Sequence, residues 1–209
     1  MVNNMHVIGL TGCSGAGKGE VSLVLMSHGI KCLDTDKVSR AVCEPGKPCL
    51  GELVEYFGDG ILLPDGTLDR KGLAALVFGE PNEELKSVKH AALNRITHRH
   101  IVDAINDWLK ECAKDGDTFA CVDAPQLFES GFDRHCDYII GVIADEDVRT
   151  RRIVARDGIT PDAAKKRISA QKSKSFFIET CDFVVYNNAG VDVLGGQVNN
   201  ILEKINFFA

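Results

Sequence analysis

The feature that most constrains this chain is a glycine-rich run at residues 12–17, Gly-Cys-Ser-Gly-Ala-Gly, followed by Lys18. Apolar residues from Met5 to Leu10 precede it and helical spacing resumes after it, so the pattern predicts a strand, a loop and a helix. The spacing Gly12-x-x-x-x-Gly17-Lys18 is typical of a loop whose N–H groups surround phosphate oxygens. The alternative is a glycine-rich turn that binds nothing, and the flanking strand and helix favour the phosphate site.

Two residues after the lysine depart from the usual loop, in which a Ser or Thr hydroxyl holds Mg²⁺. The segment Gly-Ala-Gly-Lys-Gly at 15–19 resembles the adenylate-kinase loop, in which Gly stands at the position of Gly19 and water carries most of the Mg²⁺ contacts. Glu20 either faces the phosphates, which its charge would repel, or points away to solvent within the first helical turn. We expect the second, because the helix dipole favours a carboxylate there.

The composition bounds the class of protein. A chain of 209 residues with 44% hydrophobic residues is typical of one globular core with room for an inserted subdomain. The net charge of −6 gives no global case for nucleic acid or an anionic membrane. The eight cysteines contain no CxxC pair, which favours reduced thiols and the cytoplasm over a zinc or disulfide framework. We expect no leader peptide and no membrane span, since no apolar run approaches about 18 residues.

Further along the chain, strands are expected at 30–33, 119–123, 137–143 and 183–186, and helices at 19–28, 37–43, 50–57, 69–78, 83–114 and 191–205. The strands are nearly continuous in apolar residues, as in a parallel sheet covered on both faces. We therefore predict a three-layer α/β fold with a mainly parallel five-stranded sheet. Its core would comprise about 1–40, 117–147 and 181–209, with a helical substrate subdomain at about 41–116 and a helical lid at about 148–180.

Carboxylates follow two of these strands, where open α/β sheets bind ligands. Asp34 either caps the next helix or faces that crevice, whereas Asp36 is the better candidate for chemistry. Asp123 ends a buried strand, where a carboxylate orients Mg²⁺ or its waters in phosphate-loop enzymes; the alternative is a cap.

Residues 148–174 hold nine basic side chains against two acidic ones. Arg152 and Arg156 share one helical face, so they suit a lid that closes over triphosphate oxygens. The alternatives are a solvated face and nucleic-acid binding, and the second is disfavoured because no aromatic residues are interleaved. His98 and His100 do not face one side of a helix, which disfavours a metal site.

The whole set of motifs resembles the dephospho-CoA kinase family over Gly9 to about Gly190. The motifs that carry this resemblance are Gly9-Leu10-Thr11-Gly12, Asp34-Thr35-Asp36 with Arg40, Glu44-Pro45-Gly46, Asp65 to Arg70, Leu93-Asn94 through His98, Asp123 to Glu129, Arg152 with Arg156-Asp157, Arg167 with Gln171, and Asn187. The resemblance implies ATP-dependent phosphorylation of the ribose 3′-hydroxyl of dephospho-CoA, with Mg²⁺, in a nucleotide-kinase core with a helical CoA domain and a lid.

The resemblance also implies residue roles. Lys18 would be catalytic with Asp36, which accepts the hydroxyl proton, and with Arg152, which acts from the lid beside Arg156 and Arg167. Substrate contacts would come from Asp36, Arg40, Pro125 and Leu127, with Mg²⁺ held through water at Asp123. The residues expected to bind ATP are Gly12, Ser14, Gly15, Ala16, Gly17, Lys18, Gly19, Glu20, Arg152 and Asn187, the last of them beside the adenine.

Gly19 and Glu20 depart from the family, as do Arg99, where a proline is usual, and Gln126, where a leucine is usual. Two other functions stay open: another phosphate-loop kinase of a nucleoside, nucleotide or small metabolite, and a nucleotide-binding regulatory protein with little turnover. The block from Glu44 to Arg70 argues against a generic nucleotide kinase. We expect a monomer or weak homo-oligomer.

Overall fold

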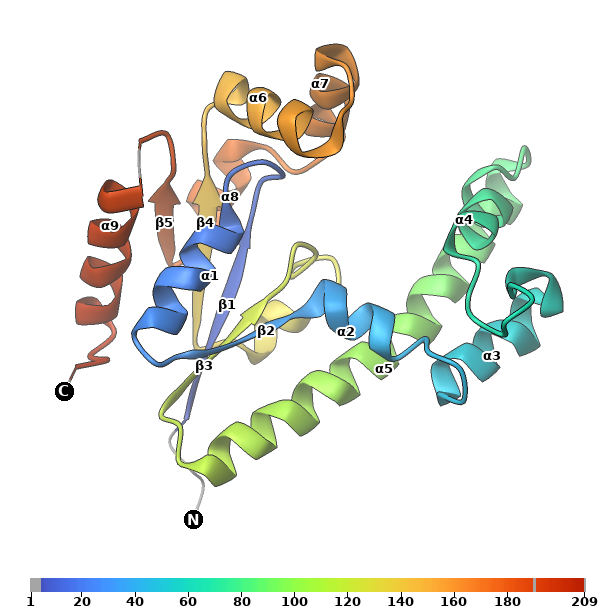
Figure 1. Cartoon of the computed structure of the whole chain (residues 1–209), viewed down its shortest axis with the longest axis horizontal. Coiled ribbons are helices and arrows are strands. Elements are labelled where there is room, and N and C mark those ends of the chain that lie inside the picture. The colour runs from blue at the N-terminus through green and yellow to red at the C-terminus, as the bar shows by residue number, and fades with distance from the viewer. Residues whose placement is uncertain (1–4, 190, 209) are drawn as a thin grey trace. The chain divides into compact units, whose positions relative to one another are not determined.

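The computed structural model describes residues 5–189 and 191–208 (Figure 1). Two compact units make up the chain: one runs to Asp34 and resumes at Leu109, and the other spans Thr35–Trp108. The first holds the sheet and the second is helical. Each is described below by itself.

The sheet unit contains β1 (His6–Gly12), β2 (Lys31–Asp34), β3 (Phe119–Asp123), β4 (Tyr138–Ile143) and β5 (Phe183–Tyr186). Their order is β2-β3-β1-β4-β5, and each described pairing is parallel. β1 therefore lies at the centre, between β3 and β4, which are rich in buried residues. The predicted α/β fold with a five-stranded parallel sheet is confirmed.

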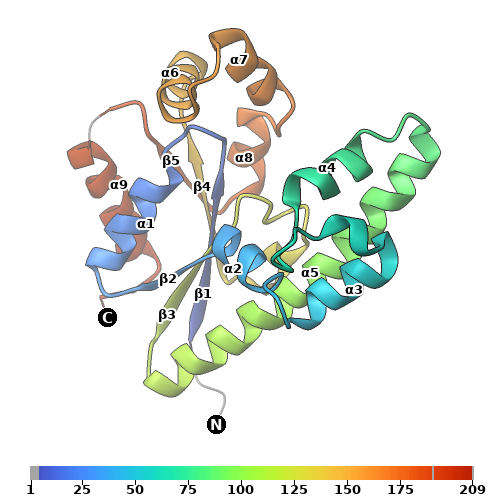
Figure 2. The same ribbon diagram turned by 45° about the vertical axis from the view of Figure 1, so that its right-hand side comes forward.

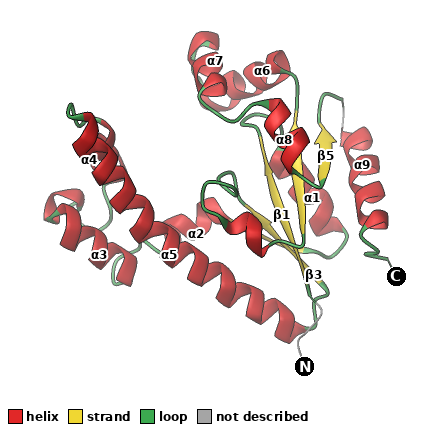
Figure 3. Cartoon of the chain, turned by 180° about the vertical axis from the view of Figure 1, so that it is seen from behind, coloured by secondary structure: helices red, strands yellow, loops and turns green. Residues whose placement is uncertain are grey.

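Helices cover both faces of this sheet. Figure 2 shows α1 (Lys18–Ser27) and α9 (Val191–Lys204) on one side and α8 (Lys174–Thr180) on the other, and Figure 3 shows the same arrangement from behind. A Cβ at Gly141 would lie 2.7 Å from Cys181 Sγ, so glycine in β4 allows α8 to approach closely. The resulting core joins side chains of all these layers, among them Ile8, Leu25, Ile140, Phe177 and Leu202.

Two further helices, α6 (Glu146–Asp157) and α7 (Pro161–Ser169), lie between β4 and α8 in the sequence. They pack on each other through Ile153, Ala164 and Ile168. Thr160 caps α7 by accepting a 3.3 Å hydrogen bond from the Ala163 N–H. A short 3-10 turn, η2 (Phe132–His135), connects β3 to β4.

The helical unit contains α2 (Thr35–Ala41), α3 (Pro48–Phe57), the 3-10 turn η1 (Asp59–Ile61), α4 (Arg70–Phe78) and most of α5 (Glu83–Asp115). Its own core includes Leu53, Ile61, Leu73, Val77 and Ile96. Asp69 caps α4 by accepting from the N–H groups of Lys71 at 3.1 Å and Gly72 at 2.9 Å. The described residues contain no helix long and apolar enough to span a membrane.

Two helices begin earlier than predicted. α3 begins at Pro48, two residues before the expected residue 50, and α2 ends at Ala41, two residues before the expected residue 43. β2 ends at Asp34 and α2 begins directly at Thr35, two residues before the expected start. Asp36 thus lies in the first helical turn, where the dipole favours a carboxylate.

Candidate active site

The loop between β1 and α1 has a backbone that only glycine allows. Gly12 has φ +150° and Gly17 has φ +89°. A Cβ at Gly12 would lie 2.2 Å from the Val142 carbonyl oxygen, which accepts from the Cys13 N–H at 3.0 Å. The loop is therefore fixed against the neighbouring strand, and α1 begins at Lys18 with its N-terminus at the loop.

Lys18 and Asp123 form an ion pair beside this loop. Asp123 is 8% exposed and also accepts a 3.2 Å hydrogen bond from the Ser22 hydroxyl. It lies beside Leu10 in the β1–β3 register and beside Asp34 in the β2–β3 register. The carboxyl ends of three adjacent strands thus bring two carboxylates and the loop lysine to one edge of the sheet.

Glu20 does not point away to solvent, and our preferred expectation for it is wrong. Its Oε2 accepts a 2.6 Å hydrogen bond from the side-chain amide of Asn187. A Cβ at Gly17 would lie 2.9 Å from the same oxygen, so the carboxylate folds back toward the loop. The physical reason is a buried amide, because Asn187 is 1% exposed and its N–H groups need acceptors.

Asn187 connects three parts of the sheet unit. Its amide also donates to the Ala16 carbonyl at 2.9 Å. Arg152 of α6 donates to the Asn187 main-chain oxygen at 3.0 Å, to its side-chain oxygen at 3.4 Å and to the Ala16 carbonyl at 3.3 Å. The structure therefore brings Arg152, Asn187 and Glu20 together at the loop.

Arg149 makes a contact that our sequence reasoning missed. It is 5% exposed and donates from Nε to the Ser14 carbonyl at 2.9 Å. Gln171 accepts from the Ser14 N–H at 3.0 Å and from Arg149 at 3.4 Å, which ties the segment after α7 to the loop. The available signal was the spacing of three between Arg149 and Arg152, which puts both on one face of α6.

The other two arginines of the predicted lid are engaged elsewhere. Arg156 donates to both carboxylate oxygens of Asp157, at 2.7 and 2.9 Å, and Arg167 pairs with the same carboxylate. These hydrogen bonds, that of Arg156 first, lower the pKa of Asp157 to about 2. Arg152 and Arg156 thus have different partners, although they share a helical face.

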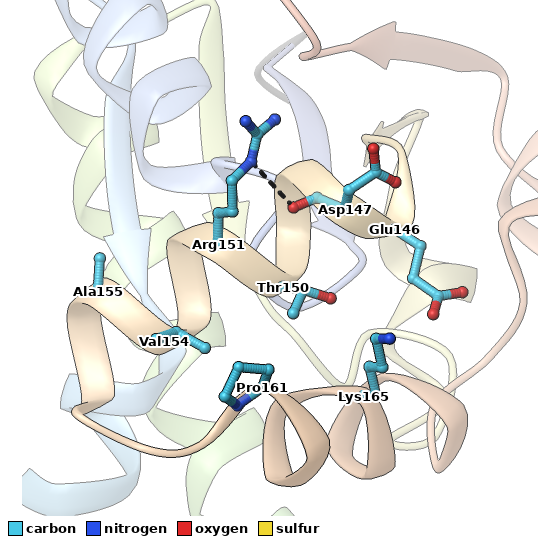
Figure 4. Close-up of a pocket in the computed structure, with 8 residues that line it drawn as sticks. All are labelled: Glu146, Asp147, Thr150, Arg151, Val154, Ala155, Pro161 and Lys165. Atoms are coloured by element: carbon cyan, nitrogen blue, oxygen red, sulfur yellow. Dashed lines mark hydrogen bonds between the residues drawn. The ribbon is translucent and has the colours of Figure 1, made fainter.

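A groove of about 720 Å³ lies between α6 and α7 (Figure 4). Its residues are Glu146, Asp147, Thr150, Arg151, Val154, Ala155, Pro161 and Lys165. None of them belongs to the predicted site, and those on α6 lie on a different face from Arg149 and Arg152. We therefore do not assign the nucleotide to this groove.

A comparison with protein families identifies the family to which this chain belongs. Residues 6–192 match the family model described as dephospho-CoA kinase. The chain belongs to the dephospho-CoA kinase family. A dephospho-CoA kinase of Corynebacterium efficiens is 39% identical over 198 residues, which are 95% of this chain and 96% of the relative. One from Corynebacterium glutamicum has the same identity and coverage.

Solved structures agree on the fold. The Thermus thermophilus protein TT1252 superposes with a TM-score of 0.80 at 26% identity, covering 96% of this chain and 97% of that one. A dephospho-CoA kinase from Campylobacter jejuni gives a TM-score of 0.68 at 23% identity, covering 95% and 96%. This second likeness supports the fold alone.

The remaining residues that the dephospho-CoA kinase resemblance implied lie as follows. Asp36 and Arg40 are exposed on α2, four residues apart and so on one helical face. Pro125 is exposed just after β3. Leu127 is fully buried beside Gly9 and belongs to the interior of the sheet unit, so in this structure its side chain serves packing.

Proposed function

We propose that this chain transfers the γ-phosphoryl group of ATP to the ribose 3′-hydroxyl of dephospho-CoA, giving coenzyme A and ADP. The observation that carries the proposal is the Lys18–Asp123 pair at a glycine-shaped phosphate loop, in a chain that matches this kinase family over residues 6–192. The relatives' names supply the acceptor, and the loop supplies the reason for a nucleotide triphosphate donor.

In the proposed mechanism the sheet unit holds the nucleotide. Loop N–H groups and the α1 N-terminus surround phosphate oxygens, and Lys18 neutralises charge on the terminal phosphates. Arg152 is already held at the Ala16 carbonyl, so its guanidinium stabilises the charge of the transferred group without a large search for position. Asn187, which holds Arg152, borders the nucleotide from the end of β5.

The acceptor chemistry is assigned to the helical unit. Asp36 accepts the proton of the attacking hydroxyl. Its carboxylate is exposed and so accessible to an acceptor. A carboxylate is basic enough for this role because the transition state is loose and the proton leaves late. Arg40, on the same face of α2, contacts an anionic part of the acceptor. Pro125 is a further candidate contact, and the burial of Leu127 argues for packing instead of binding.

Mg²⁺ fits these residues only through phosphate oxygens and water. Among the described residues no group of three or more His, Cys, Asp or Glu side chains could hold a metal ion. Mg²⁺ commonly keeps several waters and takes one or two carboxylates besides substrate phosphates, and Asp123 with Ser22 offers such a partial set. When bound, the ion would supply further charge neutralisation at the phosphates.

The test is a coupled assay that follows ADP with ATP and Mg²⁺ and with dephospho-CoA, adenosine, AMP or shikimate as the acceptor. We expect turnover with dephospho-CoA and background rates with the others. Faster turnover of another acceptor would replace the proposal with a different kinase. Nucleotide binding without turnover of any of them would support the regulatory alternative.

A further inference from the structure

Two cysteines of the helical unit lie in contact across the turn that joins α2 to α3. The Sγ atoms of Cys43 and Cys49 are 3.6 Å apart. Cys43 is 4% exposed and Cys49 is fully buried, and both belong to the core of this unit with Leu53 and Ile61. The described thiols are free, so the contact is between two reduced sulfurs.

The segment between the two cysteines is short and exposed. Residues 44–47 all face solvent, and Gly46 turns the chain with φ +83°. A disulfide needs the sulfurs about 2.05 Å apart, so they must approach by roughly 1.5 Å. Because such loops have few buried contacts, a local opening of this segment can bring Cys43 to solvent.

The surroundings make the two thiols unequal. The Cys49 thiol stabilises a thiolate on Cys43 by hydrogen bonding, and with the help of the Arg70 guanidinium this lowers the pKa of Cys43. The same interaction raises the pKa of Cys49, and burial and the nearby Glu52 carboxylate raise this pKa further. Cys43 is therefore the attacking sulfur and Cys49 the resolving one.

We propose that Cys43 and Cys49 form a dithiol site that low-molecular-weight disulfides convert to an intramolecular disulfide. The Cys43 thiolate attacks one sulfur of the oxidant, whose S–S bond breaks and whose first half leaves as a thiolate that takes up the Cys43 proton. Cys49 then loses its proton, attacks Cys43 Sγ and displaces the second half as a thiol. Two electrons pass from the two cysteine sulfurs to the oxidant, and two thiols are released.

The bond would act on the segment that carries proposed acceptor residues. The Cys43 N–H donates to the Arg40 carbonyl at 3.2 Å, and Arg70 donates to the carbonyls of Ser39 at 3.4 Å and Arg40 at 3.5 Å. Drawing Cys43 toward Cys49 therefore pulls on the end of α2. This expectation rests on the proposed function: the disulfide should raise the KM for dephospho-CoA several-fold and leave the KM for ATP unchanged.

The chain offers its own comparison pair. Cys32 and Cys121 are register partners on β2 and β3, and they also interact through their side chains. Cys121 is fully buried in β3, and the pairing of β2 with β3 holds both cysteines in place within the sheet. We expect this pair to stay reduced under conditions that oxidise Cys43 and Cys49.

The experiment incubates the full chain with oxidised glutathione at graded ratios to reduced glutathione, then measures intact mass and maps peptides. The expected result is the loss of two hydrogens, a peptide joining Cys43 to Cys49, and no such loss in Cys43→Ser or Cys49→Ser. The matched control is Cys112→Ser, which removes another buried thiol and should oxidise like the parent.

A parent chain that stays reduced, stops at a mixed disulfide or links Cys32 to Cys121 would overturn the proposal. An unchanged KM for dephospho-CoA in the disulfide form would overturn the link to the acceptor segment. Because the mass readout needs no turnover, failure of the kinase assay with the reduced chain would reject the proposed function alone.

Discussion

Glu20 directly follows Gly19, which occupies the position where phosphate loops usually carry a Ser or Thr hydroxyl. Its carboxylate accepts a 2.6 Å hydrogen bond from the Asn187 amide. The charge thus sits close to the loop, yet it has a definite structural partner. One N–H of a buried amide depends on it, while the other goes to Ala16. Its removal therefore affects the amide before it affects the phosphates.

Replacing Glu20 by threonine is expected to lower the free energy of unfolding by about 1–3 kcal/mol, because the shorter side chain leaves a buried N–H without an acceptor. Glu20→Gln is the matched control, since it keeps an oxygen acceptor and removes the charge, and it should lose less. Chemical denaturation measures both. A Glu20→Thr chain of parental stability that binds ATP more tightly at every Mg²⁺ concentration would show that repulsion is the main effect.

Asp36→Asn is expected to lower kcat by about 10²–10⁴-fold while ATP binding stays unchanged, because the carboxylate is assigned to the acceptor hydroxyl. Steady-state kinetics and an ATP titration separate the two effects. Asp103→Asn, at another exposed helical position of the same unit, is the control and should behave as the parent. Unchanged kcat together with weaker ATP binding would reassign Asp36 to the nucleotide.

Among the elements, α6 serves two purposes on two faces. Arg149 and Arg152 reach the loop carbonyls of Ser14 and Ala16, whereas Arg151 belongs to the groove and donates to the Asp147 carbonyl at 3.3 Å (Figure 4). The pair of neighbouring arginines therefore provides a clean comparison within one turn of helix.

Arg152→Ala is expected to lower kcat/KM for ATP about 10- to 100-fold, as a hydrogen bond to a charged group contributes about 1.5–3 kcal/mol. Arg151→Ala, which removes the same kind of side chain at the adjacent position, should leave kcat/KM for ATP unchanged within experimental error. Steady-state kinetics with ATP as the varied substrate measures both. Equal losses in the two variants would mean that the total positive charge of α6, and not the position of Arg152, determines ATP use.

Most helices and strands could be predicted from the sequence, because the strands are continuous apolar runs and the loop has a fixed glycine spacing. Tertiary contacts could not be predicted in this way. The direction of Glu20 depends on a buried amide 167 residues away. The Cys43–Cys49 contact depends on how a turn closes, and the burial of Leu127 depends on its packing beside Gly9 in β1. Local pattern carries no information on such pairs.

At the scale of the whole molecule, the chain combines a sheet unit that carries the loop, Lys18 and Arg152 with a helical unit that carries Asp36 and Arg40. The boundaries of the substrate subdomain and of the lid stay predictions. What the account claims of the whole is a single reaction: one phosphoryl group moves from ATP to one hydroxyl of dephospho-CoA.

The most direct test of this claim is identification of the product after incubation with ATP, Mg²⁺ and dephospho-CoA, by mass spectrometry and phosphorus NMR. The account predicts ADP and an equal amount of a product with a new phosphate on the ribose 3′ oxygen. Lys18→Ala should form about 10²–10³-fold less of it, as for the loss of one preorganised hydrogen-bond donor. The control is Lys31→Ala, which should match the parent because Lys31 pairs with Asp115 and Asp117 and not with a residue of the loop. ADP formed without this product, or a phosphate on any other oxygen, would contradict the account.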